Sequence, residues 1–152
     1  MRVLMVTSEW PTSNEPFRAP FVRRQVEFLR QEGVDIEVFH FRGGMKLRNY
    51  LKAWSRVGEL TARGGFNLVH AQWGQSALLC LPRKLPLVIT YRGSDLAGIF
   101  GSNGRQTLRG RILALSSRCV SLFADHVIVV SEHLAKTLPP QVRTMSFRVE
   151  WT

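Results

Sequence analysis

The segment that follows the strand predicted at residues 87–91 carries four residues suited to binding chemistry: Arg92, Gly93, Ser94 and Asp95. An arginine is permanently charged and can hold an anion such as a phosphate. The glycine lets the backbone approach a ligand, and the two short polar side chains can hydrogen-bond hydroxyl groups. Asp95 suits a helix cap or a turn equally well. We therefore expect a site for an anionic or hydroxyl-bearing ligand here.

A second polar segment, residues 67–74, also ends a predicted strand and contains His70 and Trp73. His70 is a candidate for binding because it stands at the carboxyl end of that strand. Structural roles are predicted for the other histidines, which are His40, His126 and His133. The histidines show neither metal-ligand spacing nor a partner cysteine, so no metal site is predicted.

Several common catalytic motifs are absent from the sequence. The turn after the first predicted strand has no glycine, so the Gly-x-Gly-x-x-Gly fingerprint of NAD enzymes is missing. Gly98 and Gly104 are one residue too far apart for a phosphate-binding loop, and Arg105 stands where that loop needs lysine. No Gly-x-Ser-x-Gly nucleophile motif occurs. These absences argue against an intact small nucleotide-binding enzyme.

The composition indicates one ordinary globular domain with an excess of positive charge. The 152 residues are 45% hydrophobic, and 21 Lys and Arg against 11 Asp and Glu give a net charge of +10. Such an excess favours an anionic partner: a phosphorylated ligand, an acidic lipid surface or nucleic acid. No stretch suits a transmembrane helix or a signal peptide, so a cytoplasmic location is predicted. Cys80 and Cys119 lie in apolar contexts and are predicted to be buried, reduced thiols.

Short apolar strands alternate with helices along the chain. Strands are predicted at residues 1–7, 34–41, 67–71, 87–91 and 126–130, with a further alternating run at 145–149, and helices at about 21–29, 46–62, 75–81, 107–123 and 132–138. This order predicts an α/β fold with a doubly wound, mainly parallel sheet and helices on both faces. Two long loops, residues 8–16 and 92–105, follow strands directly. Because α/β sheets bind ligands beyond their carboxyl strand ends, these loops are the expected site.

The predicted helix at residues 46–62 combines cations with aromatic residues. Its basic side chains are Lys46, Arg48, Lys52 and Arg56, and Tyr50 and Trp54 fall at helical spacing beside them. Helices that lie on anionic membranes have this composition. An apolar stripe that packs on the sheet, with solvated arginines, explains the same pattern. Both interpretations remain open at this point.

Three segments in sequence order resemble a known enzyme family. They are Val-His-Ala-Gln-Trp-Gly at 69–74, Thr-Tyr-Arg-Gly-Ser-Asp at 90–95 and Val-Ile-Val-Val-Ser at 127–131. Together with residues 3–11 and 19–33, they resemble the N-terminal, acceptor-side half of retaining family 4 glycosyltransferases of the GT-B fold. The resemblance covers residues 1–140. It implies a single Rossmann-like domain over residues 1–152, with the C-terminal donor domain of such enzymes absent.

The resemblance implies transfer of a sugar from a nucleotide-sugar to a saccharide or lipid-linked acceptor in surface polysaccharide synthesis. The donor is a substrate, no separate cofactor is expected, and the isolated chain is expected to be inactive. The implied substrate-binding residues are Arg92, Gly93, Ser94, Asp95, His70, Trp73, Phe17 and Arg18. Where the family usually has histidine, this chain has Arg92 and Gln72. Arginine cannot act as a base, so residue 92 is expected to bind phosphate or sugar hydroxyls.

A lipid-linked acceptor would place the domain on the inner face of a membrane, with Lys46, Arg48, Tyr50, Lys52, Trp54 and Arg56 at the anionic surface. The alternative interpretation is a stand-alone basic α/β module that binds an anionic ligand or nucleic acid. The arginines are scattered over several segments and no nucleic-acid recognition motif is visible. Nucleic acid is therefore not an expected partner.

Overall fold

The computed structural model describes residues 1–44, 46–102 and 104–146. Six strands form one sheet in the order β2-β1-β3-β4-β5-β6, and every neighbouring pair is parallel. The strands are β1 (Arg2–Thr7), β2 (Asp35–His40), β3 (Leu68–Gln72), β4 (Leu87–Tyr91), β5 (His126–Val129) and β6 (Thr144–Ser146). The predicted α/β class is confirmed. The run predicted at 145–149 contributes to β6, and its residues 147–149 lie outside the described residues.

The helices follow the predicted order with three differences. They are α1 (Pro20–Gln31), α2 (Leu47–Arg63), α3 (Trp73–Leu78), α4 (Ser94–Ala97), α5 (Leu108–Ser121) and α6 (Glu132–Ala135). α3 begins two residues before the predicted start, and the short α4 was not predicted. α6 ends at Ala135 because the next residues form tight turns, in which the Leu138 amide donates to the Ala135 carbonyl.

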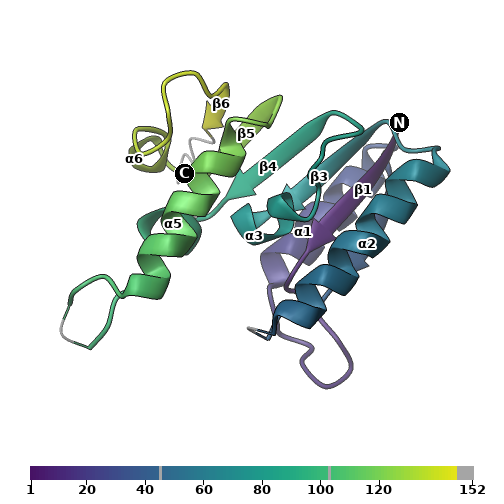
Figure 1. Cartoon of the computed structure of the whole chain (residues 1–152). Helices are drawn as coiled ribbons and strands as arrows, with labels where there is room; N and C mark the ends of the chain where they lie inside the picture. Colours follow the sequence, from purple (N-terminus) through teal and green to yellow (C-terminus); the bar gives the residue numbers. More distant parts are fainter. Residues whose placement is uncertain (45, 103, 147–152) are drawn as a thin grey trace, which may run out of the picture.

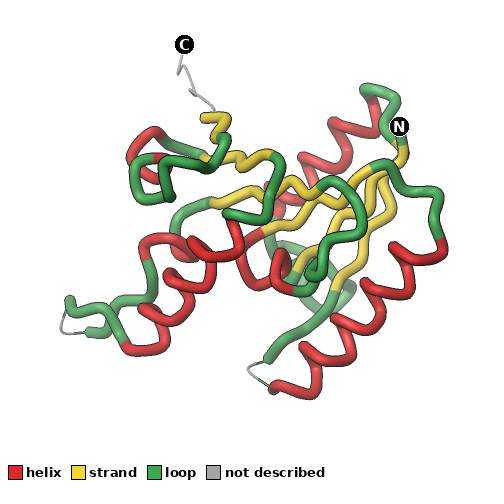
Figure 2. The backbone as a smooth tube through the Cα atoms, turned by 45° about the horizontal axis from the view of Figure 1, so that its top comes forward, coloured by secondary structure: helices red, strands yellow, loops and turns green. Residues whose placement is uncertain are grey.

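The helices cover both faces of the sheet, as predicted. Alternate residues of a strand point to opposite faces. Leu4 and Val6 of β1 therefore join the larger core, which includes residues of α2, α3 and α5, while Val3 and Met5 join the smaller core under α1. Figure 1 shows α1 behind the sheet and α2, α3 and α5 in front of it, and Figure 2 shows the strands between these helices.

The strand order places a switch point between β1 and β3. The chain moves from β1 outward to β2, and then crosses back past β1 to β3 and onward. Because all strands are parallel, Thr7, Gln72 and Tyr91 end at the same edge of the sheet. Ligands of open α/β sheets bind at this kind of position.

The prediction for the cysteines is half right. Both thiols are free, and Cys80 is buried, which raises the pKa of its thiol to about 12. Cys119 is exposed, so the prediction for it was wrong. Its helix, α5, packs on the domain through the small residues Gly110, Ala114 and Ser117, and Cys119 falls on the opposite side of the helix.

Candidate functional site

Arg92 lies in a polar cluster built by β3, β4 and α1. Its Nη2 donates to the side-chain oxygens of Gln72 and Gln25, at 3.0 Å in each case. Gln72 in turn donates to Gln25 across 2.9 Å. The guanidinium lies over the ring of Phe21, 4.6 Å from its centroid. The cluster therefore fixes the direction of the Arg92 side chain at the edge of the sheet.

Arg92 retains its positive charge in a partly buried position. Burial lowers its pKa, and the negative charge of Asp95 opposes this shift. The Arg92 Nε atom is buried and has no hydrogen-bond partner among the described residues. Within the described part of the chain, no carboxylate forms an ion pair with this guanidinium. An anion bound nearby would satisfy a charge that the protein leaves only partly compensated.

His70 supports this cluster from within the sheet. Its Nε2 lies 2.7 Å from the Thr90 hydroxyl and 3.4 Å from Gln72 Nε2. The side chain is buried, and burial, together with the charge of Arg92, lowers its pKa to about 4. The imidazole is therefore neutral at neutral pH. Because β3 continues two residues beyond it, His70 does not stand at the very end of the strand. It supports Gln72 and Thr90 within the sheet, and its contact with a ligand stays a prediction.

Gly93, Ser94 and Asp95 form the turn into α4. Gly93 has a φ of 140°, which a residue with a side chain rarely adopts. Ser94 is exposed at the start of the helix. Asp95 is only 2% exposed, and its Oδ1 accepts from the Gly93 amide at 3.1 Å. The structure therefore supports the turn interpretation of Asp95, whose burial also raises the pKa of its carboxyl group.

A hollow of about 390 Å³ lies at the same edge of the sheet as this cluster, over the carboxyl ends of β1 and β2. Two arginines face it, Arg18 and Arg42, and both bind Glu15, at 3.0 Å and 2.5 Å. The hydrogen bond from Arg18 is the main reason that the pKa of Glu15 is lowered. The lining residues are Ser8, Glu9, Arg18, Arg42, Gly43, Gly44, Tyr50 and Gln75. The hollow thus offers charges of both signs, a phenol and an amide.

Tyr50 turns into this hollow, where its hydroxyl donates to Gln75 at 3.0 Å and its ring packs edge-on against Phe41. A Cβ on residue 43 would lie 2.3 Å from the Tyr50 oxygen, so a larger residue there would displace the Tyr50 ring. The predicted pair of interfacial aromatic residues is therefore corrected, since Tyr50 is not on the solvent side of α2. Trp54 remains partly exposed, with its Nε1 donating to the Leu81 carbonyl.

The remaining predicted residues occupy different positions around the sheet edge. Trp73 has a φ of 70°, a strained backbone conformation for a residue with a side chain, and its ring packs edge-on against Phe21 with centroids 6.1 Å apart. Phe17 is 89% exposed and lies outside both the cluster and the hollow. The structure therefore gathers Arg92 and Trp73 around Phe21, places Arg18 in the hollow, and leaves Phe17 apart.

Sequence reasoning missed four polar residues of this region: Gln25, Gln72, Arg42 and Gln75. Gln25 lies between Val22 and Val26 on α1, and a polar residue beside a buried stripe was a usable signal. Gln72 was noted only as a departure from the family. Arg42 and Gln75 carry no such signal, because only the fold brings them together.

The basic residues of α2 lie on the surface, with Lys46, Arg48, Lys52 and Arg56 exposed. Arg56 pairs with Glu59 at 2.8 Å. None of the helices in the described ranges is long and apolar enough to cross a bilayer. The same part of the chain holds no group of three or more His, Cys, Asp or Glu side chains placed to bind a metal ion.

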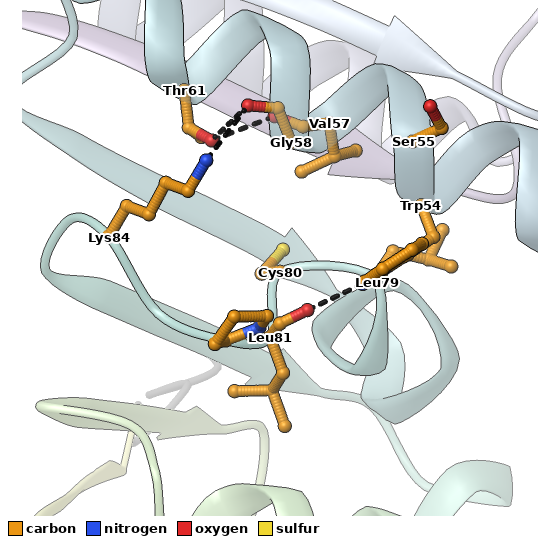
Figure 3. Close-up of a pocket in the computed structure, with 10 residues that line it drawn as sticks. Trp54, Ser55, Val57, Gly58, Thr61, Leu79, Cys80, Leu81 and Lys84 are labelled. Carbon is orange, nitrogen blue, oxygen red and sulfur yellow. Dashed lines mark hydrogen bonds between the residues drawn. The ribbon is translucent and has the colours of Figure 1, made fainter.

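A second hollow, of about 350 Å³, lies between α2 and the segment that joins α3 to β4 (Figure 3). Its lining is mostly apolar, and Trp54 and Lys84 lie at its sides. The lining residues are Trp54, Ser55, Val57, Gly58, Thr61, Leu79, Cys80, Leu81, Pro82 and Lys84. Because these segments lead into the amino ends of β3 and β4, this hollow is at the opposite edge of the sheet from Arg92.

Comparisons with known proteins identify a family and a fold. Residues 1–143 match the family described as "Glycosyl transferase 4-like domain". Sucrose-phosphate synthase from Thermosynechococcus elongatus has a similar fold, with a TM-score of 0.70 at 12% identity over 95% of this chain and 47% of that chain. A second structure of sucrose-phosphate synthase from this organism gives 0.64 at 15% identity, over 96% of this chain and 87% of that chain. No curated protein sequence matches. The chain spans about half the length of the first of these structures.

Proposed function

The chain belongs to the glycosyl transferase 4-like family, and on this premise we propose that it forms the acceptor-side half of a retaining glycosyltransferase. The expectation drawn from residues 69–74 and 90–95 is thereby confirmed at the level of the family. The proposed reaction transfers a sugar from a nucleotide-sugar to a saccharide or glycolipid acceptor in surface polysaccharide synthesis.

The observation that carries this proposal is the polar hollow at the same edge of the sheet as the Arg92 cluster, next to the switch point between β1 and β3. Its volume of about 390 Å³ falls within the ordinary range for small-molecule sites. Arg18, Arg42, Glu9 and Gln75 offer both donors and acceptors, as a sugar with many hydroxyl groups requires. We therefore assign the acceptor saccharide to this hollow.

Arg92 is the proposed electrostatic element of the reaction. Sugar transfer leaves negative charge on the departing diphosphate, and a fixed cation stabilises that charge. Gln25 and Gln72 hold the guanidinium in one orientation, so little reorganisation is needed when the charge develops. Arginine does not exchange a proton at neutral pH, so this role is electrostatic.

A second domain is proposed to supply most of the contacts to the nucleotide. The match that spans 95% of this chain covers only 47% of sucrose-phosphate synthase, which supports a larger complete enzyme. The proposal predicts that calorimetric titration of the isolated chain with UDP- or GDP-sugars detects weak binding or none. Low-micromolar binding needs roughly 7 to 8 kcal/mol. That affinity from this chain alone would contradict the half-enzyme proposal and favour a self-sufficient anion-binding module.

The lipid-linked acceptor is proposed to bring the domain to the cytoplasmic face of an anionic membrane. The exposed cations of α2 support this, because basic residues are attracted to acidic lipid headgroups. Lys52→Glu combined with Arg56→Glu is expected to weaken adsorption to acidic vesicles. Equal adsorption of the variant and the wild type would mean that these cations are solvated and do not bind lipid.

A further inference from the structure

The large apolar side chains of α5 point into solvent. Leu108, Ile112 and Leu115 are 74%, 60% and 64% exposed, and Leu122, just beyond the end of the helix, is 54% exposed. Cys119 is exposed between the last two. These residues recur every three or four positions, so they form one continuous stripe along the helix. Scattered exposed apolar residues are normal, but a continuous stripe indicates an interaction surface.

The side of α5 that faces the domain is made mostly of small residues instead. Gly110, Ala114 and Ser117 are buried there. A Cβ on Gly110 would lie 2.3 Å from the Ile99 amide nitrogen, and a Cβ on Gly74 of α3 would lie 2.2 Å from the Ser117 hydroxyl. α5 therefore packs closely on its neighbours mainly through small residues, and Val120 near its end is also buried in the core. Amphipathic helices normally direct their large apolar residues to the core, so this stripe is not explained by folding.

The charge around the stripe has one sign. Arg109, Arg111 and Arg118 are exposed on α5. The sequence contains no Asp or Glu between Asp95 and Asp125. An apolar stripe bordered by cations is the arrangement that binds at the boundary between lipid headgroups and acyl chains.

We propose that the outer face of α5 docks on an anionic lipid surface, with the stripe inserted among the lipids and the arginines at the headgroups. This inference rests on the membrane association proposed above and assigns it a second, apolar anchor. A second copy of the chain fits less well, because a symmetric contact between two α5 helices would bring arginines together without acidic partners on either helix. Figure 1 shows α5 and α2 on the same side of the sheet.

Co-sedimentation of the full chain with phosphatidylcholine vesicles, with and without phosphatidylglycerol, tests this proposal. Two paired variants address the stripe and its charges: Ile112→Gln with Leu115→Gln, and Arg111→Glu with Arg118→Glu. Matched controls on α1, at the other face of the sheet, are Phe28→Gln and Arg24→Glu, since both side chains are exposed. All these positions are on the surface, and circular dichroism melts verify that the variants fold.

The wild type is expected to bind acidic vesicles and to bind neutral ones much more weakly. Each basic residue near an anionic surface strengthens adsorption by about fivefold, so the paired arginine reversals should weaken it by more than about 30-fold. The paired glutamine variant should weaken it by at least about tenfold through lost burial of apolar surface. The α1 controls should bind as the wild type does.

Four outcomes would overturn the proposal. The first is equal binding by the wild type and the paired glutamine variant. The second is no binding of the wild type to acidic vesicles at low salt, where electrostatic attraction is strongest. The third is a dimer, detected by sedimentation velocity, that the glutamine variant abolishes, because the partner would then be a second copy. Loss of binding only in the Lys52→Glu, Arg56→Glu variant would overturn the role of α5 while keeping the membrane association of α2.

Discussion

Replacing His70 by glutamine tests the electrostatics of the buried cluster. His70 is neutral in the folded chain because burial lowers its pKa from 6.5 to about 4. The unfolded chain binds a proton at this residue below about pH 6.5, whereas the folded chain does so only below about pH 4. The contribution of His70 to the free energy of unfolding is therefore fully present above pH 6.5 and is lost as the pH falls toward 4.

The size of the effect follows from the shift. Each pKa unit corresponds to about 1.4 kcal/mol, so the complete loss is about 3 kcal/mol, of which about 2 kcal/mol falls between pH 7 and 5. Glutamine can still hydrogen-bond the Thr90 hydroxyl but does not titrate. Between pH 7 and 5, the unfolding free energy of His70→Gln is therefore expected to fall by about 2 kcal/mol less than that of the wild type.

Urea unfolding at a series of pH values between 7 and 5 measures this difference. His133→Gln is the matched control, because His133 is exposed on α6. Parallel curves for His70→Gln and the wild type would refute the assignment of a buried, neutral imidazole. If His133→Gln instead removed the pH dependence of the unfolding free energy, His70 would not be the titrating group.

Two further predictions concern packing and charge. Gly74→Ala should destabilise the fold by about 1 to 3 kcal/mol, because the added Cβ would meet the Ser117 side chain, whereas Gly58→Ala, with open space around it in α2, should stabilise by about 0.5 to 1 kcal/mol. Urea unfolding of both variants checks this, and equal effects would contradict the tight contact between α3 and α5. In a two-domain enzyme that contains this chain, Arg92→Ala should lower kcat by more than about tenfold with little change in Tm, and the reverse pattern would make Arg92 structural.

The sequence predicts the order of elements well because α/β units repeat a simple pattern. Each strand is a short apolar run, and the helices between them carry regular apolar stripes, so the sheet and its two covered faces follow from periodicity. The same logic misplaced Cys119. α5 has apolar residues on two sides, and periodicity alone does not show that Gly110, Ala114 and Ser117 form the packed side.

The sequence predicts the edge of the sheet at which the candidate residues lie, but only some of the residues that gather there. Loops after the predicted strands do hold Arg92 and Arg18 at one edge of the sheet. The partners of Arg92, however, come from α1 and β3, and residues so distant in sequence are joined only by the tertiary structure. The prediction placed His70 at a strand end and Tyr50 at a membrane surface, because a sequence gives spacing but not how far a strand continues or how a helix is rotated.

Backbone amide chemical-shift mapping of the isotope-labelled chain with a panel of hexoses and short oligosaccharides tests the assignment of the acceptor site most directly. We predict that saturable shift changes concentrate at Ser8, Gly43, Gly44 and Gln75, which line the polar hollow, and that Arg42→Ala weakens them. Changes centred instead on Gly58 and Cys80, in the hollow at the opposite edge of the sheet, or no saturable change with any sugar, would contradict the assignment.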